Sequence, residues 1–217
     1  MSAFPNSPRL LKGGLVLVDP DSGAVGRIIV LQYNPDTLTR SLQPQGTSGE
    51  SADRSEAMRL KGPPIETIKL EAEIDATDQL ESADSTATGV GIHPQLAALE
   101  LIVYPPSSTL QANNALAQAG TLEISPVLAP LSLFIWSKNR IVPVRLTDFS
   151  VTEEAFDTAL NPIRAKVSLG LRVLSVNDFN FADKGGSLFM AYQQQKEQLA
   201  ARSAGGTLSV LGIGGIP

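Results

Sequence analysis

The chain has 217 residues, and its 42% hydrophobic and 18% charged content is typical of a globular protein rather than a disordered one. Its formal net charge of −5 argues against a surface for nucleic acid, which is normally basic. The absence of cysteine excludes disulfides and thiolate chemistry, and the single histidine excludes histidine-rich metal sites. The sequence has no apolar run of the roughly 20 residues that a membrane span needs and no signal-peptide segment, so we expect a protein that starts in the cytoplasm and does not insert into a membrane.

The first part of the chain predicts a loose arm followed by short strands. Residues 1–13 are rich in proline, serine and asparagine and form the expected arm. Two apolar runs, at 14–19 and 27–33, flank a Pro-Asp-Ser-Gly stretch of the kind that forms turns, which predicts a hairpin. A short strand is expected at 37–42, and the polar residues 43–56 predict a flexible loop.

The middle of the chain predicts one amphipathic strand, a second loop and helices. In the strand at 66–75, four apolar residues share one face: Ile68, Leu70, Ala72 and Ile74. Residues 76–91 are polar and rich in glycine, serine and threonine, which predicts another long loop. His93-Pro94 opens a helix. Its expected apolar face carries Leu96, Leu99 and Val103. A further short helix is expected at 109–119.

Residues 131–173 carry the strongest pattern, with three strand-like runs separated by short polar breaks. In the last run alternate residues are apolar: Ile163, Ala165, Val167, Leu169, Leu171 and Val173. In the run before it, the apolar residues change parity between Leu146 and Phe149, which predicts a β-bulge near Thr147–Asp148. The segment therefore predicts strands with one buried and one solvated face.

The C-terminal part predicts a helix and an apolar tail. Ser187 is a suitable N-cap for a helix that runs to about Arg202. One stripe of this helix carries Leu188, Tyr192, Gln195 and Leu199. The tail Gly205–Pro217 combines glycines with five aliphatic residues: Leu208, Val210, Leu211, Ile213 and Ile216. These residues would be unusual on a tail surrounded by water, so we expect the tail to dock on a partner; the alternative is that it folds back on its own domain.

Together these elements predict a β-rich α+β fold. Seven or so strands with one or two helices and long loops would form a small β-barrel or two packed antiparallel sheets. We expect three parts: an N-terminal arm and first strand at 1–24, a main domain at 25–180, and the helix and tail at 181–217.

The polar residues show no pattern typical of an enzyme. His93 precedes a helix, and the carboxylates nearest to it in sequence lie in loops, so a structural role is favoured over a general base. Glu153, Glu154 and Asp157 lack the alternating oxygen ligands and central glycine of a calcium loop, so a solvated turn is favoured. We therefore expect neither a metal nor a cofactor.

Two further signals also favour structural roles. Gly89-Val90-Gly91 has no strand before it that would make it a dinucleotide-binding turn. Trp136 could stack on a sugar, but a tryptophan at the end of an apolar strand more often belongs to the core or its rim. No G-x-S-x-G nucleophile elbow is present. The expectation is that the protein is not an enzyme.

Several short motifs follow one another along the chain. A strand leads into Tyr33-Asn34-Pro35, and Gly62-Pro63-Pro64 precedes a strand that ends at Asp75. A helix begins at Pro94 and ends at Tyr104-Pro105, and a later strand carries Trp136. Phe156 comes shortly before Asn161-Pro162-Ile163-Arg164-Ala165. In order and spacing these motifs, over residues 25–178, resemble the tube/baseplate protein family of contractile injection systems, the relatives of phage tails and type VI secretion.

The resemblance implies a tube-like fold and a homo-oligomeric, hexameric ring. Such a ring is a hub–tube adaptor of the baseplate, with the spike hub, inner-tube and baseplate proteins of the same particle as partners. It implies assembly in the cytoplasm, followed by incorporation into a phage-tail-like particle that is intracellular, membrane-anchored or released.

Many relatives carry a LysM module after this domain, whereas here only a short Gly-rich tail follows the last expected helix. This difference favours a purely structural adaptor. The alternative is a module of the same particle that binds carbohydrate or peptidoglycan through Trp136 and the tyrosines.

Overall fold

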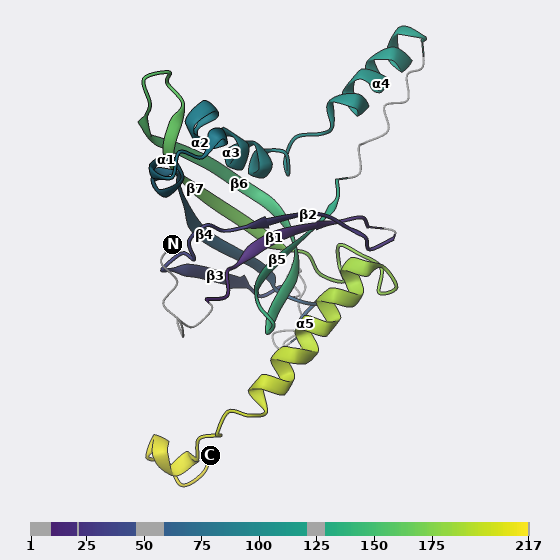
Figure 1. Cartoon of the computed structure of the whole chain (residues 1–217). Helices are drawn as coiled ribbons and strands as arrows, with labels where there is room; N and C mark the ends of the chain where they lie inside the picture. The colour runs from purple at the N-terminus through teal and green to yellow at the C-terminus, as the bar shows by residue number, and fades with distance from the viewer. Residues whose placement is uncertain (1–9, 21, 47–58, 121–128, 217) are drawn as a thin grey trace.

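Seven antiparallel strands form a single sheet in the computed structural model, which describes residues 10–20, 22–46, 59–120 and 129–216 (Figure 1). The strands, in chain order, are β1 (Gly14–Val18), β2 (Val25–Val30), β3 (Leu38–Gln43), β4 (Ile65–Asp75), β5 (Leu131–Ser137), β6 (Arg140–Phe156) and β7 (Pro162–Val173). Their order across the sheet is β2-β1-β5-β6-β7-β4-β3. The β-rich α+β class that the sequence predicts is confirmed.

Five α-helices and one 3-10 turn complete the described chain. They are α1 (Thr77–Glu81), α2 (Ser85–Val90), α3 (His93–Glu100), α4 (Ser107–Gln118), α5 (Lys184–Ala200) and η2 (Leu208–Leu211). In Figure 1, α1 to α3 lie together at one end of β6 and β7, α4 extends away from the sheet, and α5 leads down to the tail. The expectation of only one or two helices is therefore wrong.

The sheet curls because its longest strand, β6, pairs with β5 near its start and with β7 along the rest of its length. The register shifts between Leu146 and Asp148, which confirms the predicted bulge and lets the strand bend. As a result, Leu15 and Leu17 of β1 share one buried cluster with Ile68 and Leu70 of β4.

The curled sheet stays open. Its edge strands are β2 and β3, so within the described residues it forms neither a closed barrel nor two packed sheets, and those two expectations are wrong. The Gln32 side chain crosses the gap: its Nε2 donates to the Asp75 carbonyl oxygen at 2.6 Å, and its Oε1 accepts from the Asp75 amide at 3.0 Å. A side-chain amide thus supplies the donor and acceptor that a neighbouring strand would otherwise offer.

The predicted buried faces of β4 and β7 are confirmed. The alternating apolar residues of β4 are all buried, as are those of β7 from Ala165 to Val173. Ile163, at the start of β7, is partly buried against the same core. These strands bury only one face, so apolar and polar residues alternate along them, and this local pattern can be recognised in the sequence.

The loop predicted at 76–91 contains two short helices instead. Asp84 Oδ1 accepts from the amides of Thr86 and Ala87, each at 3.0 Å, and so caps α2. Ala76 and Ala87 are buried, which anchors the two helices on the core. Helices this short are stabilised mainly by a cap and by packing, and apolar periodicity does not reveal them. Of the loop predicted at 43–56, residues 47–56 lie outside the described residues, as do residues 1–9 of the arm.

Two helices differ from expectation in their bounds and in which of their residues are buried. The helix that begins at His93 ends at Glu100, and a turn then buries Ile102 and leaves Val103 48% exposed. The C-terminal helix starts at Lys184 rather than at Ser187, because Gly185 and Gly186 fit directly against Phe179 and Asn180. Its buried residues include Phe189 and Tyr192, whereas Leu199 is 41% exposed. None of the helices within the described ranges combines the length and hydropathy needed to cross a membrane.

Candidate functional site

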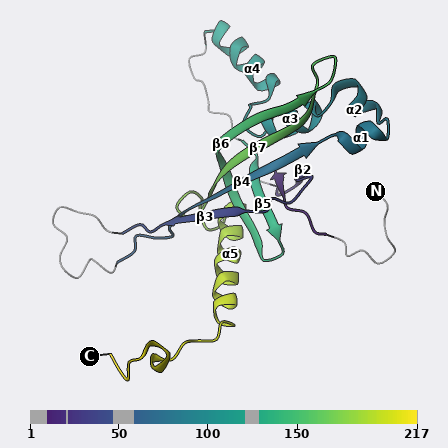
Figure 2. The same cartoon turned by 90° about the vertical axis from the view of Figure 1, so that its left-hand side faces the viewer.

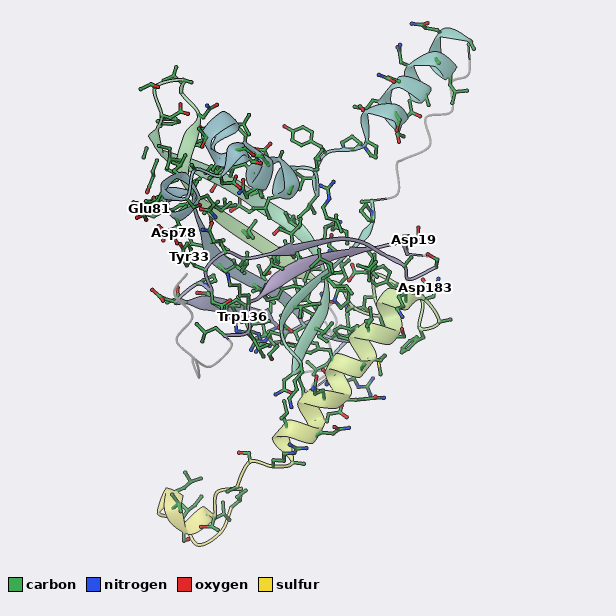
Figure 3. The ribbon with its side chains drawn as sticks, viewed as in Figure 1. Asp19, Tyr33, Asp78, Glu81, Trp136 and Asp183 are labelled. Atoms are coloured by element: carbon green, nitrogen blue, oxygen red, sulfur yellow. The ribbon has the colours of Figure 1, made fainter. Side chains whose placement is uncertain are left out.

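The Tyr33-Asn34-Pro35 motif lies where β2 leaves the sheet, and it holds the N-terminal strand in place. The Asn34 side chain accepts from the Gly13 amide at 2.9 Å and donates to the Leu11 carbonyl oxygen at 2.8 Å. Tyr33 is 47% exposed beside an open groove of about 1180 Å³. Figure 3 shows Tyr33 on the same flank of the molecule as Asp78 and Glu81.

That groove is acidic. Asp36, Glu71, Glu73 and Asp78 line it, and Lys12 is the one basic residue among the described residues of its lining. Lys12 Nζ donates to the Gln32 carbonyl oxygen at 2.8 Å. Within the described residues no group of acidic or histidine side chains has the arrangement needed to hold a metal ion. The groove therefore presents negative charge at the exit of β2.

Asp75, Pro162, Arg164 and Ala165 come together at one end of the sheet, as members of the neighbouring strands β4 and β7. Arg164 Nη2 lies 2.6 Å from Asp75 Oδ2, and Asp75 Oδ1 accepts hydrogen bonds from the amide and hydroxyl of Thr77. Burial alone would raise the pKa of Asp75, but the Thr77 hydrogen bonds and the Arg164 ion pair outweigh it and lower that pKa. Ala165 is fully buried. These positions join α1 to the sheet.

The β6–β7 hairpin ends at Phe156, which is 49% exposed and lies opposite Pro162. Asp157 shapes the turn: Oδ1 accepts from the amides of Ala159 and Asn161, each at 2.8 Å. Glu154 pairs with Lys166 at 3.1 Å. Asp157 therefore lies in a turn, as the sequence predicts, whereas Glu153 and Glu154 belong to β6 rather than to a turn.

The Gly89-Val90-Gly91 segment also has a packing role. Gly91 has a φ of 58°, and a Cβ built on it would lie 2.2 Å from the Pro162 carbonyl oxygen. The Ile92 amide donates to the same oxygen at 2.9 Å. Only glycine fits this close approach, which fixes α2 and α3 against the hairpin. His93 follows as the first residue of α3, and its side chain is exposed.

Trp136 and Gly62 lie in separate packing contacts. The Trp136 ring stacks on Phe134 with centroids 5.9 Å apart, and a Cβ on Gly13 would lie 2.6 Å from its Cε3 atom. Trp136 is thus partly buried within the curled sheet and already has aromatic and backbone neighbours. Gly62 has a φ of 154°, and a Cβ on it would lie 3.1 Å from the Asn177 side-chain nitrogen.

A buried charge cluster beneath the sheet was not predicted. Glu66 of β4 is only 3% exposed. It accepts from Arg40 of β3 at 2.8 Å, and from Tyr192 and Lys196 of α5 at 3.1 and 3.0 Å. Lys196 Nζ also lies 4.0 Å from the Tyr192 ring centroid. The sequence does indicate that Glu66 is buried, because Glu66 has the same strand parity as Ile68 and Leu70 and so belongs to the buried face of β4.

The cluster shifts two pKa values in opposite directions. Burial alone would raise the pKa of Glu66, but its hydrogen bonds and charge interactions with Lys196 and Arg40 lower it below 4.5. Burial, followed by the negative charge of Glu66, raises the pKa of Tyr192 to about 12. Both shifts keep Glu66 ionised and Tyr192 protonated at neutral pH. The cluster therefore acts as a joint that fixes α5, from which the tail continues, relative to the sheet.

The C-terminal tail leaves α5 with its aliphatic residues uncovered. Their exposed fractions are 40% for Leu208, 80% for Val210, 72% for Leu211, 43% for Ile213 and 80% for Ile216. A Cβ on Gly205, Gly206, Gly214 or Gly215 would meet no atom within 4 Å. Figures 1 and 2 show the tail extending from the end of α5 away from the sheet.

The edge strand β2 also exposes apolar side chains. Val25, Ile28 and Val30 are 59%, 63% and 56% exposed. Beside this strand lies a groove of about 390 Å³, formed by β2, the end of β4 and α3.

No protein-family model and no curated protein matches this chain.

Proposed function

We propose that this chain is a structural subunit of a contractile injection particle, in which it forms an adaptor ring between the spike hub and the inner tube. The observation that carries the proposal is the ordered series of motifs from Tyr33 to Ala165 within a β-rich α+β fold. Several of those motifs are structural joints in the molecule: Asn34 holds the first strand, and Asp75 and Arg164 join α1 to the sheet.

The surfaces left open support a role in assembly. The sheet ends in the apolar edge strand β2, α4 has no buried residue, and the tail exposes five aliphatic residues. A soluble monomer rarely exposes so many separate apolar surfaces, whereas a ring subunit covers them with its neighbours. The acidic groove beside Tyr33 adds a surface suited to a basic partner segment.

The test has two parts. The purified chain is examined by native mass spectrometry and negative-stain electron microscopy, where we expect hexameric rings. An epitope-tagged chain is then expressed in its native host, and sheathed particles are purified. The tag should co-purify with the particles and be labelled at one end of the tube. Absence of the tag from purified particles would refute the proposal.

A further inference from the structure

We propose that the tail, residues 205–216, of one copy docks on a second copy of the chain, in the groove along the open edge of β2. This contact would explain how neighbouring subunits of the proposed ring are joined. It rests on the proposed function only for the number of copies in the ring. It joins two exposed apolar surfaces that lie apart in the molecule, the edge strand β2 within the sheet and the tail beyond α5 (Figure 1).

The groove is suited to an extended apolar segment. Ile28 and Val30 of β2, Ala72 and Ile74 of β4, and Ala98 and Leu99 of α3 contribute to its lining. Among the described strands β2 pairs only with β1, so its other edge can accept main-chain hydrogen bonds from an added strand. A segment that enters this groove would gain apolar burial and backbone pairing together.

The tail has the matching chemistry. After Arg202 the chain carries no charged side chain, so no charged side chain of the tail needs to be desolvated on entry. Its glycines allow the backbone to approach an edge strand closely, and its aliphatic residues supply apolar area. Its one regular element among the described residues is the short turn η2, which a modest rearrangement would extend.

Among the described residues, the helix α4 is a second uncharged candidate, and it fits less well. Its Leu110 and Leu116 are 53% and 49% exposed. Because its main-chain groups are paired within the helix, α4 cannot extend the sheet at β2. The tail is therefore the better occupant of a groove that offers an unpaired strand edge.

A second copy is favoured over the same copy by the position of the tail. The cluster of Glu66, Tyr192 and Lys196 fixes α5 beneath the sheet, and the tail continues from α5 on the side away from α3 (Figures 1 and 2). Docking between two different surfaces is head-to-tail, and such contacts repeat until they close a ring or extend a filament.

Disulfide trapping tests the contact, because the chain has no natural cysteine. Purified Ile28→Cys and Val210→Cys chains are mixed and oxidised. We expect a covalent dimer that requires both variants, while an Glu81→Cys chain, with its cysteine on α1, gives none with Val210→Cys. Dimers in the Ile28→Cys chain alone, or none in the mixture, would overturn the proposal. If the Val210→Cys chain is oxidised within purified particles and cross-links only to a different protein, that result would also overturn the proposal.

A binding experiment separates docking from folding. A labelled peptide of residues 205–216 should bind a chain truncated after residue 204, and Ile28→Asp should weaken that binding at least about tenfold. Ile28 is exposed, so the melting temperature of this variant should not change. Leu110→Asp alters a similarly exposed aliphatic residue on α4 and should leave peptide binding intact. Equal binding to both variants would contradict the proposal.

The two proposals fail in distinguishable ways. If the mixed disulfide forms but the chain is absent from particles, the docking contact stands and the proposed function fails. If the chain is present in particles and the mixed disulfide never forms, the proposed function stands and the docking contact fails.

Discussion

Glu66 shows how a single residue can connect parts of the chain that are far apart in sequence. Among the described residues it is the only buried charged residue, and its partners come from β3 and α5. A buried carboxylate is tolerated when it is paired and hydrogen-bonded, and the partners here supply both kinds of interaction. Arg40 and Lys196 keep 28% and 31% of their side chains exposed, so water completes their solvation.

Replacing Glu66 by alanine should therefore destabilise the fold moderately. We expect a loss of about 1–3 kcal/mol in the free energy of unfolding, because Tyr192 loses an acceptor while the two cations can still reach water. Urea denaturation measures the loss, and hydrogen exchange should show faster exchange of the α5 amides. Glu73→Ala, on an exposed position of the same strand, should change stability by no more than about 0.5 kcal/mol. Equal losses in the two variants would contradict this role.

The same residue predicts how stability depends on pH. The pKa of Glu66 is lower in the folded chain than its ordinary 4.5, so the unfolded chain binds more protons in acid. The stabilisation from the cluster is present above that ordinary value and is lost as the pH falls through the folded pKa. Glu66→Gln should make the urea midpoint less sensitive to acid than in the natural chain. An unchanged acid dependence would show that other carboxylates control it.

The two faces of β7 can be tested at adjacent residues. Val167 is fully buried, so Val167→Asp would place an unpaired charge in the core and cost more than about 4 kcal/mol. Lys166 forms a surface pair with Glu154, and Lys166→Asp should cost only about 1 kcal/mol. Thermal unfolding of both variants gives the comparison, and similar melting temperatures would show that the two faces are assigned wrongly.

At the scale of elements, the contact of α2 and α3 with the hairpin depends on one glycine. Gly91→Ala would force a Cβ against the Pro162 carbonyl oxygen at a positive φ, which should cost about 1–3 kcal/mol. Gly89 lies inside α2 with no atom near its Cβ direction, so Gly89→Ala should be neutral or stabilise the chain by about 0.5–1 kcal/mol. Chemical denaturation of the two variants distinguishes them, and equal effects would contradict the close contact.

The tail and the domain can also be separated by truncation. Deleting residues 205–217 removes aliphatic residues that are exposed in the isolated chain, so its melting temperature should stay nearly unchanged. Under the proposed function, the truncated chain should no longer enter particles. A large drop in melting temperature would show that the tail packs on its own domain, and normal incorporation would show that it has no docking role.

At the scale of the whole molecule, the sequence determined the strands, their buried faces and the bulge in β6. These follow from alternation along each strand, which is a local property. The tertiary structure decided that β6 bridges both halves of one open sheet, that Gln32 meets Asp75 and that Glu66 meets Tyr192. It also decided the helices α1 and α2, whose stability comes from a cap and buried alanines. Such features depend on residues that are distant in the chain, and local periodicity does not predict which distant residues will be in contact.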